Sequence, residues 1–291
     1  MKPSPFAWTA PESIEEAVAL LGRLGDQAKV LAGGQSLVPI LNMRLAAPAH
    51  LVDINRLAEL SYVRADDGRV TIGALARHAQ VERDEATAEA LPLLRQALRQ
   101  VAHPVIRNRG TTVGSLAHAD PSGEMTAVLA LTGGTVTAAS RDGRREIAAA
   151  EFFLGPLESA LQPGELAVSA TFPTFPDGTG TAFVEVARRH GDYAVCGLAA
   201  AVTVTDGMVT SARAGYISLA PTPLVLDLSA AVAGAEPDRA DWGAAGELAA
   251  GQVDPEPDIH ASADYRRHLA RVLTVRALRE AAGAATTKKA A

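Results

Sequence analysis

The chain has 291 residues, of which 48% are hydrophobic and 21% are charged, a composition typical of a globular protein. The net charge is -6, and no run of Lys and Arg interleaves with aromatic residues, which argues against a nucleic-acid-binding surface. A single cysteine, Cys196, excludes an internal disulfide and a set of thiolates for an iron–sulfur cluster. The seven histidines are scattered without an HExxH pattern, and we expect no metal site.

The sequence also predicts where the protein resides. Its first ten residues, MKPSPFAWTA, lack the basic-then-apolar pattern of a signal peptide. The longest apolar run, residues 194–202, is much shorter than the roughly 18 residues that a membrane helix needs. We therefore expect a cytoplasmic protein.

The first predicted elements form a small βαβ unit. Ser13 and Glu16 form an S-x-x-E capping box before an amphipathic helix, which Gly25 ends. A strand (residues 29–33), a helix (36–46) and a second strand (50–54) follow. This order predicts a local parallel sheet.

The remainder predicts antiparallel strands and helices. Three hairpins are indicated by Asp-Gly turns at 67–68, 142–143 and 206–207. Helices are predicted over residues 86–102, 125–133 and most of the final portion, and residues 172–181 read as a linker. We predict an α+β protein with a βαβ lobe (1–57), a second α/β lobe (58–175) and a C-terminal antiparallel sheet with helices (176–291).

Two glycine-containing turns carry the chemistry. In the first, Gly33 and Gly34 let a backbone approach a ligand closely, and Gln35 and Ser36 add side-chain donors before a helix N-terminus. Such a turn suits a phosphate, although a plain strand-ending turn has the same pattern. In the second, residues 109–121, hydroxyls and Asp120 suit a polar ring edge or sugar, although a polar helix-capping loop is the alternative. The chain has neither the P-loop nor the G-x-G-x-x-G pattern.

The two segments together, AGGQS and TTVGSLAHADP, with LVDINRL after the first, resemble the FAD-binding medium subunit of molybdenum hydroxylases. This family includes the medium subunit of aerobic carbon monoxide dehydrogenase and the FAD domain of xanthine dehydrogenase. The resemblance extends over nearly the whole chain, through RRHGDYA at 188–194. It implies a vanillyl-alcohol-oxidase-like (PCMH-type) FAD-binding fold, in which the first two lobes hold FAD.

The resemblance also implies which residues bind the cofactor. The pyrophosphate would be held by Ala32, Gly33, Gly34, Gln35 and Ser36, and the flavin by Thr111, Thr112, Val113, Gly114 and Ser115. Asp120 would accept from sugar hydroxyls, and Tyr193 would either shield the flavin face or be a half-buried strand residue. The family has T-x-G-G-S where Val113 replaces the first glycine here, and a positive φ at that position would strain a β-branched residue.

The resemblance further implies function and partners. FAD would be bound non-covalently, because position 35 is Gln and not a histidine that links to flavin. Electrons would come from [2Fe–2S] clusters on a small subunit, after oxidation at a molybdopterin on a large subunit, and leave to a quinone or cytochrome. A dimer of heterotrimers is expected. The alternatives are a self-contained flavin oxidase or dehydrogenase, and a non-enzymatic module that has lost the flavin.

Overall fold

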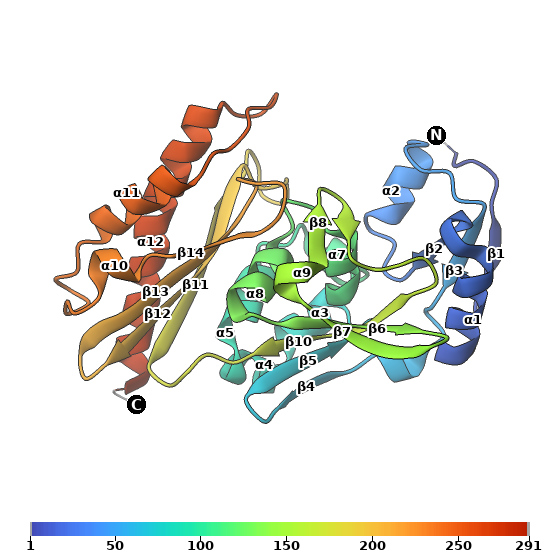
Figure 1. Ribbon diagram of the computed structural model, residues 1–291, viewed down its shortest axis with the longest axis horizontal. Coiled ribbons are helices and arrows are strands. Elements are labelled where there is room, and N and C mark those ends of the chain that lie inside the picture. The colour runs from blue at the N-terminus through green and yellow to red at the C-terminus, as the bar shows by residue number, and fades with distance from the viewer. Residues whose placement is uncertain (1, 290–291) are drawn as a thin grey trace.

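The computed structural model describes residues 2–289, which form three parts side by side along the long axis of the molecule (Figure 1). The first lobe has a parallel sheet in the order β1-β3-β2, with α1 against it. The predicted βαβ unit is confirmed, and β1 is an additional strand that the sequence reading missed. Its elements are β1 (Ala7–Thr9), α1 (Ile14–Leu24), a 3-10 turn η1 (Gly25–Gln27), β2 (Ala28–Leu31), α2 (Leu37–Asn42) and β3 (His50–Asp53).

The second lobe has a five-stranded antiparallel sheet in the order β4-β5-β10-β6-β7. Its strands are β4 (Val63–Asp66), β5 (Arg69–Gly73), β6 (Thr135–Ser140), β7 (Gly143–Ala148) and β10 (Leu166–Pro173), and β8 (Phe153–Gly155) pairs separately with β9 (Glu158–Ser159). Its helices are η2 (Ala58–Leu60), α3 (His78–Arg83), α4 (Glu85–Ala90), α5 (Pro92–Leu98), α6 (Pro104–Arg107), α7 (Thr112–His118), α8 (Glu124–Thr132) and α9 (Ala149–Phe152).

Several sequence predictions for the second lobe are refined. The hairpin at Asp67-Gly68 is confirmed, whereas the second hairpin turns one residue earlier than predicted, because Gly143 already pairs with Ser140. The predicted helix over residues 86–102 is two helices, because Pro92 lacks a backbone N–H and begins α5 as a new helix.

The third part has a four-stranded antiparallel sheet in the order β11-β12-β13-β14, one strand more than predicted, with the Asp206-Gly207 hairpin confirmed. Its elements are β11 (Thr179–Val186), β12 (Cys196–Thr205), β13 (Met208–Ile217), β14 (Leu224–Asp227), α10 (Ser229–Val232), α11 (Trp242–Gln252) and α12 (Ala263–Lys289). The linker is shorter than predicted, because β10 runs to Pro173 and β11 begins at Thr179.

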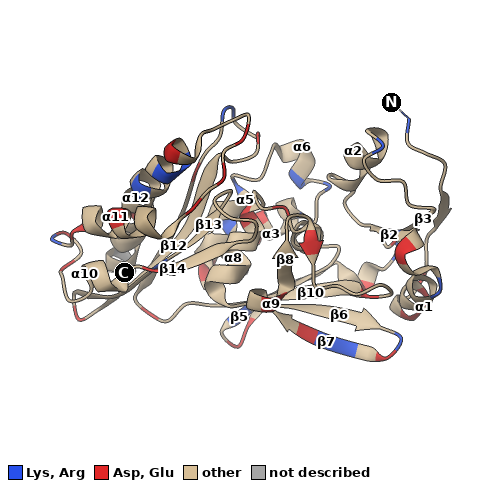
Figure 2. Ribbon diagram, turned by 45° about the horizontal axis from the view of Figure 1, so that its top comes forward, with Lys and Arg blue, Asp and Glu red and all other residues tan. Residues whose placement is uncertain are grey.

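Two hydrophobic cores hold these parts together. The first joins both N-terminal lobes and includes Phe183, Ala199 and Ile217 from the third part. The second lies between the other face of the C-terminal sheet and α11 and α12. Acidic and basic residues mix along β7 and α12 (Figure 2). Among the described residues no helix is long and apolar enough to cross a membrane, and no group of three or more His, Cys, Asp or Glu is placed to hold a metal ion.

Candidate cofactor-binding site

The first glycine turn, between β2 and α2, lies directly against the start of the second segment. A Cβ built on Gly33 would lie 2.5 Å from the carbonyl oxygen of Arg109 and 2.8 Å from Cα of Gly110. Gly34 has φ of 74°, in the left-handed region that favours glycine. The Gln35 side chain turns back and donates from Nε2 to the carbonyl of Gly33, at 3.2 Å. The two segments, about 75 residues apart in sequence, therefore meet through main-chain atoms that only a glycine allows.

The end of β3 fixes the first turn from the other side. Asn55 donates from Nδ2 to the carbonyl of Ala32 at 2.9 Å and to Asp53 Oδ1 at 2.6 Å. Asp53 Oδ1 also accepts from the Asn55 backbone N–H at 3.0 Å, and Trp8 Nε1 donates to Asp53 Oδ2 at 3.3 Å. These contacts fix the turn after β3 and join it to the first glycine turn.

A residue that the sequence reading missed joins the two lobes. The Arg77 guanidinium donates from Nη1 to the carbonyl of Arg109 at 2.6 Å and from Nη2 to Asn55 Oδ1 at 2.7 Å. Desolvation and the neighbouring charge of Arg109 lower the pKa of Arg77, and Asp53 opposes this shift. Arg77 follows β5 without any motif, so no local pattern indicated its role.

The second segment was predicted as a glycine-containing turn, with a polar helix-capping loop as the alternative, and it contains a short helix. Residues Thr112–His118 form α7, with Thr111 as its N-cap: Oγ1 of Thr111 accepts from the backbone N–H of Gly114 at 3.2 Å. A Cβ on Gly114 would lie 2.4 Å from that hydroxyl oxygen, which explains the glycine. Val113 is buried with ordinary helical backbone, so the strain considered for a β-branched residue does not arise.

Two of the predicted hydroxyl contacts are already used within the protein. Thr111 and Thr112 are buried, and Thr112 Oγ1 lies 3.2 Å from Nδ1 of His78. Desolvation and the charge of Arg107 lower the pKa of His78 to about 4, so this ring is neutral at pH 7. The His78 backbone N–H donates to the carbonyl of Gly110 at 2.9 Å. Thr111 and Thr112 therefore shape the segment, and half-buried Gly114 and Ser115 are better placed to face a ligand.

Asp120 and Tyr193, the last two residues predicted to bind the cofactor, lie near each other. Asp120 Oδ1 accepts from the backbone N–H of Ser122 at 2.8 Å, and Tyr193 is 72% exposed. Desolvation of the Tyr193 hydroxyl and the charges of Asp120 and Glu124 raise the pKa of Tyr193. The ring of Tyr193 is thus free to cover a ligand beside Asp120, from a loop more than 70 residues away in sequence.

Glu124 and Glu185 lie close to Asp120 and Tyr193, and the sequence did not single them out. Desolvation, followed by the charge of Glu185, raises the pKa of Glu124 to about 8, and Asp120 adds to the shift. Desolvation raises the pKa of Glu185 to about 7, and its buried Oε2 has no hydrogen-bond partner among the described residues. Glu124 is therefore mainly protonated at pH 7.

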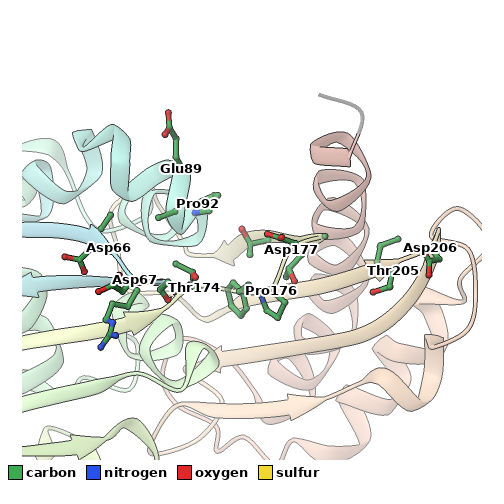
Figure 3. A pocket seen from close by; sticks show the side chains of 18 residues that line it. Asp66, Asp67, Glu89, Pro92, Thr174, Pro176, Asp177, Thr205 and Asp206 are labelled. Atoms are coloured by element: carbon green, nitrogen blue, oxygen red, sulfur yellow. Dashed lines mark hydrogen bonds between the residues drawn. The ribbon is translucent and has the colours of Figure 1, made fainter.

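Two cavities of the described residues differ in the charge of their linings, and this difference indicates which one suits a phosphate. The larger, about 820 Å³, lies between the second and third parts and is lined by five carboxylates, Asp66, Asp67, Glu89, Asp177 and Asp206 (Figure 3). Figure 3 shows these side chains spread along the cavity, where they would repel a phosphate. The smaller, about 320 Å³, is lined by Leu31, Ala32, Gly33, Gly34, Gln35, Val38, Pro39, Asp53, Asn55 and Arg109. Its glycine turn and its arginine make this smaller cavity the better phosphate site.

The structure thus brings together some predicted residues and separates others. Four of the five residues of the first turn line the smaller cavity, and the fifth, Ser36, makes no cap hydrogen bond to α2. The predicted residues of the second segment and the Asp120–Tyr193 pair are not among the lining residues of this cavity. The residues that contact the first turn are Arg109 and Gly110, at the start of the second segment and just before the predicted flavin-binding residues Thr111–Ser115.

Comparison with known families covers almost the whole chain. Residues 4–175 match the family described as FAD binding domain in molybdopterin dehydrogenase, and residues 181–281 match the CO dehydrogenase flavoprotein C-terminal domain. The chain is 41% identical to the 6-hydroxypseudooxynicotine dehydrogenase complex subunit alpha of Paenarthrobacter nicotinovorans, over 97% of this chain and 96% of that protein.

Solved structures agree with these matches. A chain of quinoline 2-oxidoreductase from Pseudomonas putida 86 superposes with a TM-score of 0.93 at 35% identity, covering 98% of this chain and 99% of that chain. A chain of carbon monoxide dehydrogenase from Hydrogenophaga pseudoflava superposes with a TM-score of 0.91 at 37% identity, covering 97% of this chain and 98% of that chain. The fold is therefore the PCMH-type FAD-binding fold followed by an antiparallel sheet with helices, as the resemblance implied.

The chain belongs to the FAD-binding medium subunits of the molybdenum hydroxylase family, and it is an oxidoreductase component. The residues present fit the cofactor. The close approach at Gly33, the positive φ of Gly34 and the arginine at the smaller cavity suit a diphosphate. The half-buried Gly114 and Ser115 and the exposed ring of Tyr193 offer surface for a flat ring system.

Proposed function

We propose that this chain binds FAD non-covalently and carries electrons from the [2Fe–2S] clusters of a partner subunit to an external acceptor. The observation that carries this proposal is the main-chain contact of Gly33 with Arg109–Gly110 beside the smaller cavity. In this proposal Ala32–Ser36 hold the diphosphate, and Gly114, Ser115 and Tyr193 contact the flavin. When bound, FAD supplies the redox chemistry, and the protein supplies its position and electrostatic surroundings.

In this proposal Glu124 and Glu185, near Tyr193, provide protonated carboxyl groups that favour reduction of the flavin. Flavin reduction is coupled to proton uptake, so a nearby group that holds a proton at pH 7 favours it. Glu124, with a pKa of about 8, is such a group, and Glu185, with a pKa of about 7, lies beside it. At pH 7 Glu124 is thus mainly neutral and Glu185 is only partly ionised, which limits the negative charge near Asp120 and Tyr193.

In this proposal the iron–sulfur clusters and the molybdopterin are bound by partner subunits, not by this chain. The described residues offer no cluster of metal-ligating side chains, and the single cysteine is buried. We propose a small [2Fe–2S] subunit and a large molybdopterin subunit as partners, paired into a dimer of heterotrimers. A quinone or a cytochrome is the proposed acceptor, and the substrate would be selected on the large subunit. A cytoplasmic location belongs to the same proposal.

Two alternatives make different predictions. A self-contained flavin enzyme would have its flavin bleached by substrate in the isolated chain. A module without flavin would be colourless when folded. Val113, the departure from the family motif, lies in a helix without strain, so it gives this alternative no support.

The test is to express the chain with and without its neighbouring subunits and to record the absorption spectrum. We expect a yellow protein that releases FAD into the supernatant on acid precipitation. In the assembled enzyme, substrate should reduce the iron–sulfur clusters and then the flavin, while the isolated chain should stay oxidised. Flavin that remains attached to the precipitate, or a colourless folded chain, would contradict the proposal.

A further inference from the structure

Arg109 lies beside the first glycine turn, and its side chain has no partner among the residues that the structure describes. It is exposed and lines the smaller cavity with Gly33, Gly34 and Gln35. Its carbonyl oxygen is engaged by Arg77, but its guanidinium makes no ion pair or hydrogen bond with any described residue. An arginine next to a side-chain-poor turn has both the charge and the planar donors that phosphate oxygens accept.

The main chain of Arg109 is unusually well fixed for such an exposed residue. Its carbonyl accepts from Arg77 Nη1 at 2.6 Å, and Arg77 Nη2 donates to Asn55 Oδ1 at 2.7 Å. Asn55 in turn donates to the carbonyl of Ala32 at 2.9 Å. A continuous set of hydrogen bonds thus connects the two walls of the cavity, from residue 109 to residue 32.

The charges at this place leave a positive excess. The Arg109 guanidinium lies close enough to Arg77 to lower its pKa, and Asp53 is the carboxylate that opposes this effect. Asp53 is itself engaged by Asn55 and Trp8. Two guanidinium groups and one carboxylate therefore interact at this place, and an anion bound in the cavity beside Arg109 would reduce the repulsion between the two arginines.

We propose that the side chain of Arg109 binds the diphosphate of FAD, and that Arg77 is the positioning residue that sets Arg109 against the first glycine turn. This inference rests on the proposed function, because it assigns the charged ligand of the same cofactor. It adds the side chains of Arg109 and Arg77 to a diphosphate site for which the sequence motifs indicated only backbone groups and small polar side chains.

The first test compares Arg109→Gln, Arg109→Lys and the matched control Arg23→Gln, which changes an exposed arginine of α1 that does not line the cavity. Apoprotein of the full chain is titrated with FAD and, separately, with riboflavin, which lacks the diphosphate. Arg109→Gln should weaken FAD binding roughly 10- to 100-fold, the effect of one charge-assisted contact. It should leave riboflavin binding and the apoprotein Tm unchanged, and Arg109→Lys should retain part of the affinity. Arg23→Gln should bind FAD like the wild type.

The results separate this inference from the proposed function. Equal FAD affinity in the wild type and Arg109→Gln would overturn the role of Arg109 and leave the proposed function intact. A wild-type chain that binds no FAD would overturn both. Weakening of riboflavin and FAD to the same extent would show a general distortion and would also overturn the inference.

The second test isolates the positioning role of Arg77. Arg77→Gln should lower the Tm of the apoprotein, because it breaks the connection between the two lobes, and should also weaken FAD binding. If Arg77 acts through Arg109, adding Arg109→Gln to Arg77→Gln should weaken FAD binding by less than Arg109→Gln does alone. Fully additive losses would show that Arg77 does not position Arg109.

Discussion

At the scale of single residues, Gly33 is the point at which the two halves of the candidate site touch. Its missing side chain leaves room for the carbonyl of Arg109, which is a backbone atom and cannot rotate away. A methyl group here must displace the Arg109–Gly110 segment, and with it the carbonyl that Arg77 holds. The close approach of the two loops therefore depends on one glycine.

We predict that Gly33→Ala destabilises the protein by about 1–3 kcal/mol, the usual cost of overpacking, and strongly reduces FAD content. Urea unfolding of the apoprotein and flavin absorbance of the purified protein measure the two effects. Gly155→Ala is the control, because its Cβ would meet only Glu158 Oε2, at an ordinary 3.5 Å. Wild-type FAD content in Gly33→Ala would show that the contact is not needed for binding.

The second prediction at this scale concerns Glu124 and Glu185. Both have a folded-state pKa above the usual value of a carboxyl group, about 8 and about 7, so the folded state binds more protons than the unfolded state between about pH 4.5 and pH 8. Stability should therefore fall as the pH rises through this window. Glu124→Gln, which mimics the neutral acid, should remove most of this loss and be more stable than the wild type at pH 8, on the order of 2 kcal/mol.

The measurement is the free energy of unfolding of both proteins at pH 5, 6.5 and 8. The two curves should meet near pH 5 and separate towards pH 8. Glu146→Gln, at an exposed position of β7, serves as the control and should follow the wild type. Parallel curves for wild type and Glu124→Gln would exclude a raised pKa at this residue.

At the scale of elements, α7 is a short helix whose start sets the shape of the second segment. Its N-cap, Thr111, is buried, and its hydroxyl satisfies the N–H of Gly114. The Arg77–Thr111 bridge and the bond from His78 to Gly110 hold the residues just before the helix. The segment is thus held by its helix cap and by contacts with Arg77 and His78. The hydroxyls of Thr111 and Thr112 make hydrogen bonds within the protein.

Thr111→Ala should cost about 1 kcal/mol of stability, because it leaves a helical N–H without its cap, and should weaken flavin binding at the same time. Thr111→Ser keeps the hydroxyl and should retain both properties. Hydrogen exchange at the Gly114 amide gives a direct readout, with faster exchange expected in Thr111→Ala alone. If both variants exchange alike, the cap does not stabilise this turn.

At the scale of the whole molecule, the C-terminal sheet has a core on each face. One face contributes to the first core with the FAD-binding lobes, and the other packs against α12. Gly180 on β11 marks the closest approach to α12: a Cβ there would lie 2.0 Å from the carbonyl oxygen of Ala281 and 2.3 Å from the Ala285 backbone N. Backbone meets backbone at this contact, and neither side can adjust by changing a rotamer.

Gly180→Ala should therefore displace α12 and lower stability by about 1–3 kcal/mol. FAD binding to the folded protein should be kept, because the smaller cavity and the second segment lie in the other lobes, and Tyr193 lies in the loop after β11, outside the contact with α12. Thermal unfolding with and without FAD separates these effects, since bound FAD should still raise the Tm. Gly251→Ala on α11, where a Cβ meets nothing within 4 Å, is the control in the same part. Loss of the FAD-induced Tm shift in Gly180→Ala would show that α12 acts on the site.

The sequence by itself determined the local structure and the family. The βαβ unit and two Asp-Gly hairpins follow from hydrophobic patterns and turn residues that act over a few positions. The glycine turn by itself indicated a phosphate site, and FAD followed from the family that the two segments resemble. The short strand β1 was not predictable in this way, because three residues pairing with a distant strand leave no periodic pattern.

Only the tertiary structure decided how the site is assembled. The contact of Gly33 with Gly110, the bonds from Arg77 to Asn55 and to Arg109, and the nearness of Tyr193 to Asp120 each join residues about 20 to 75 positions apart. Spacing along the chain carries no information about such pairs, because sheet order and lobe packing bring them together. Residues 112–118, where the sequence predicted part of a glycine-containing turn, form the helix α7.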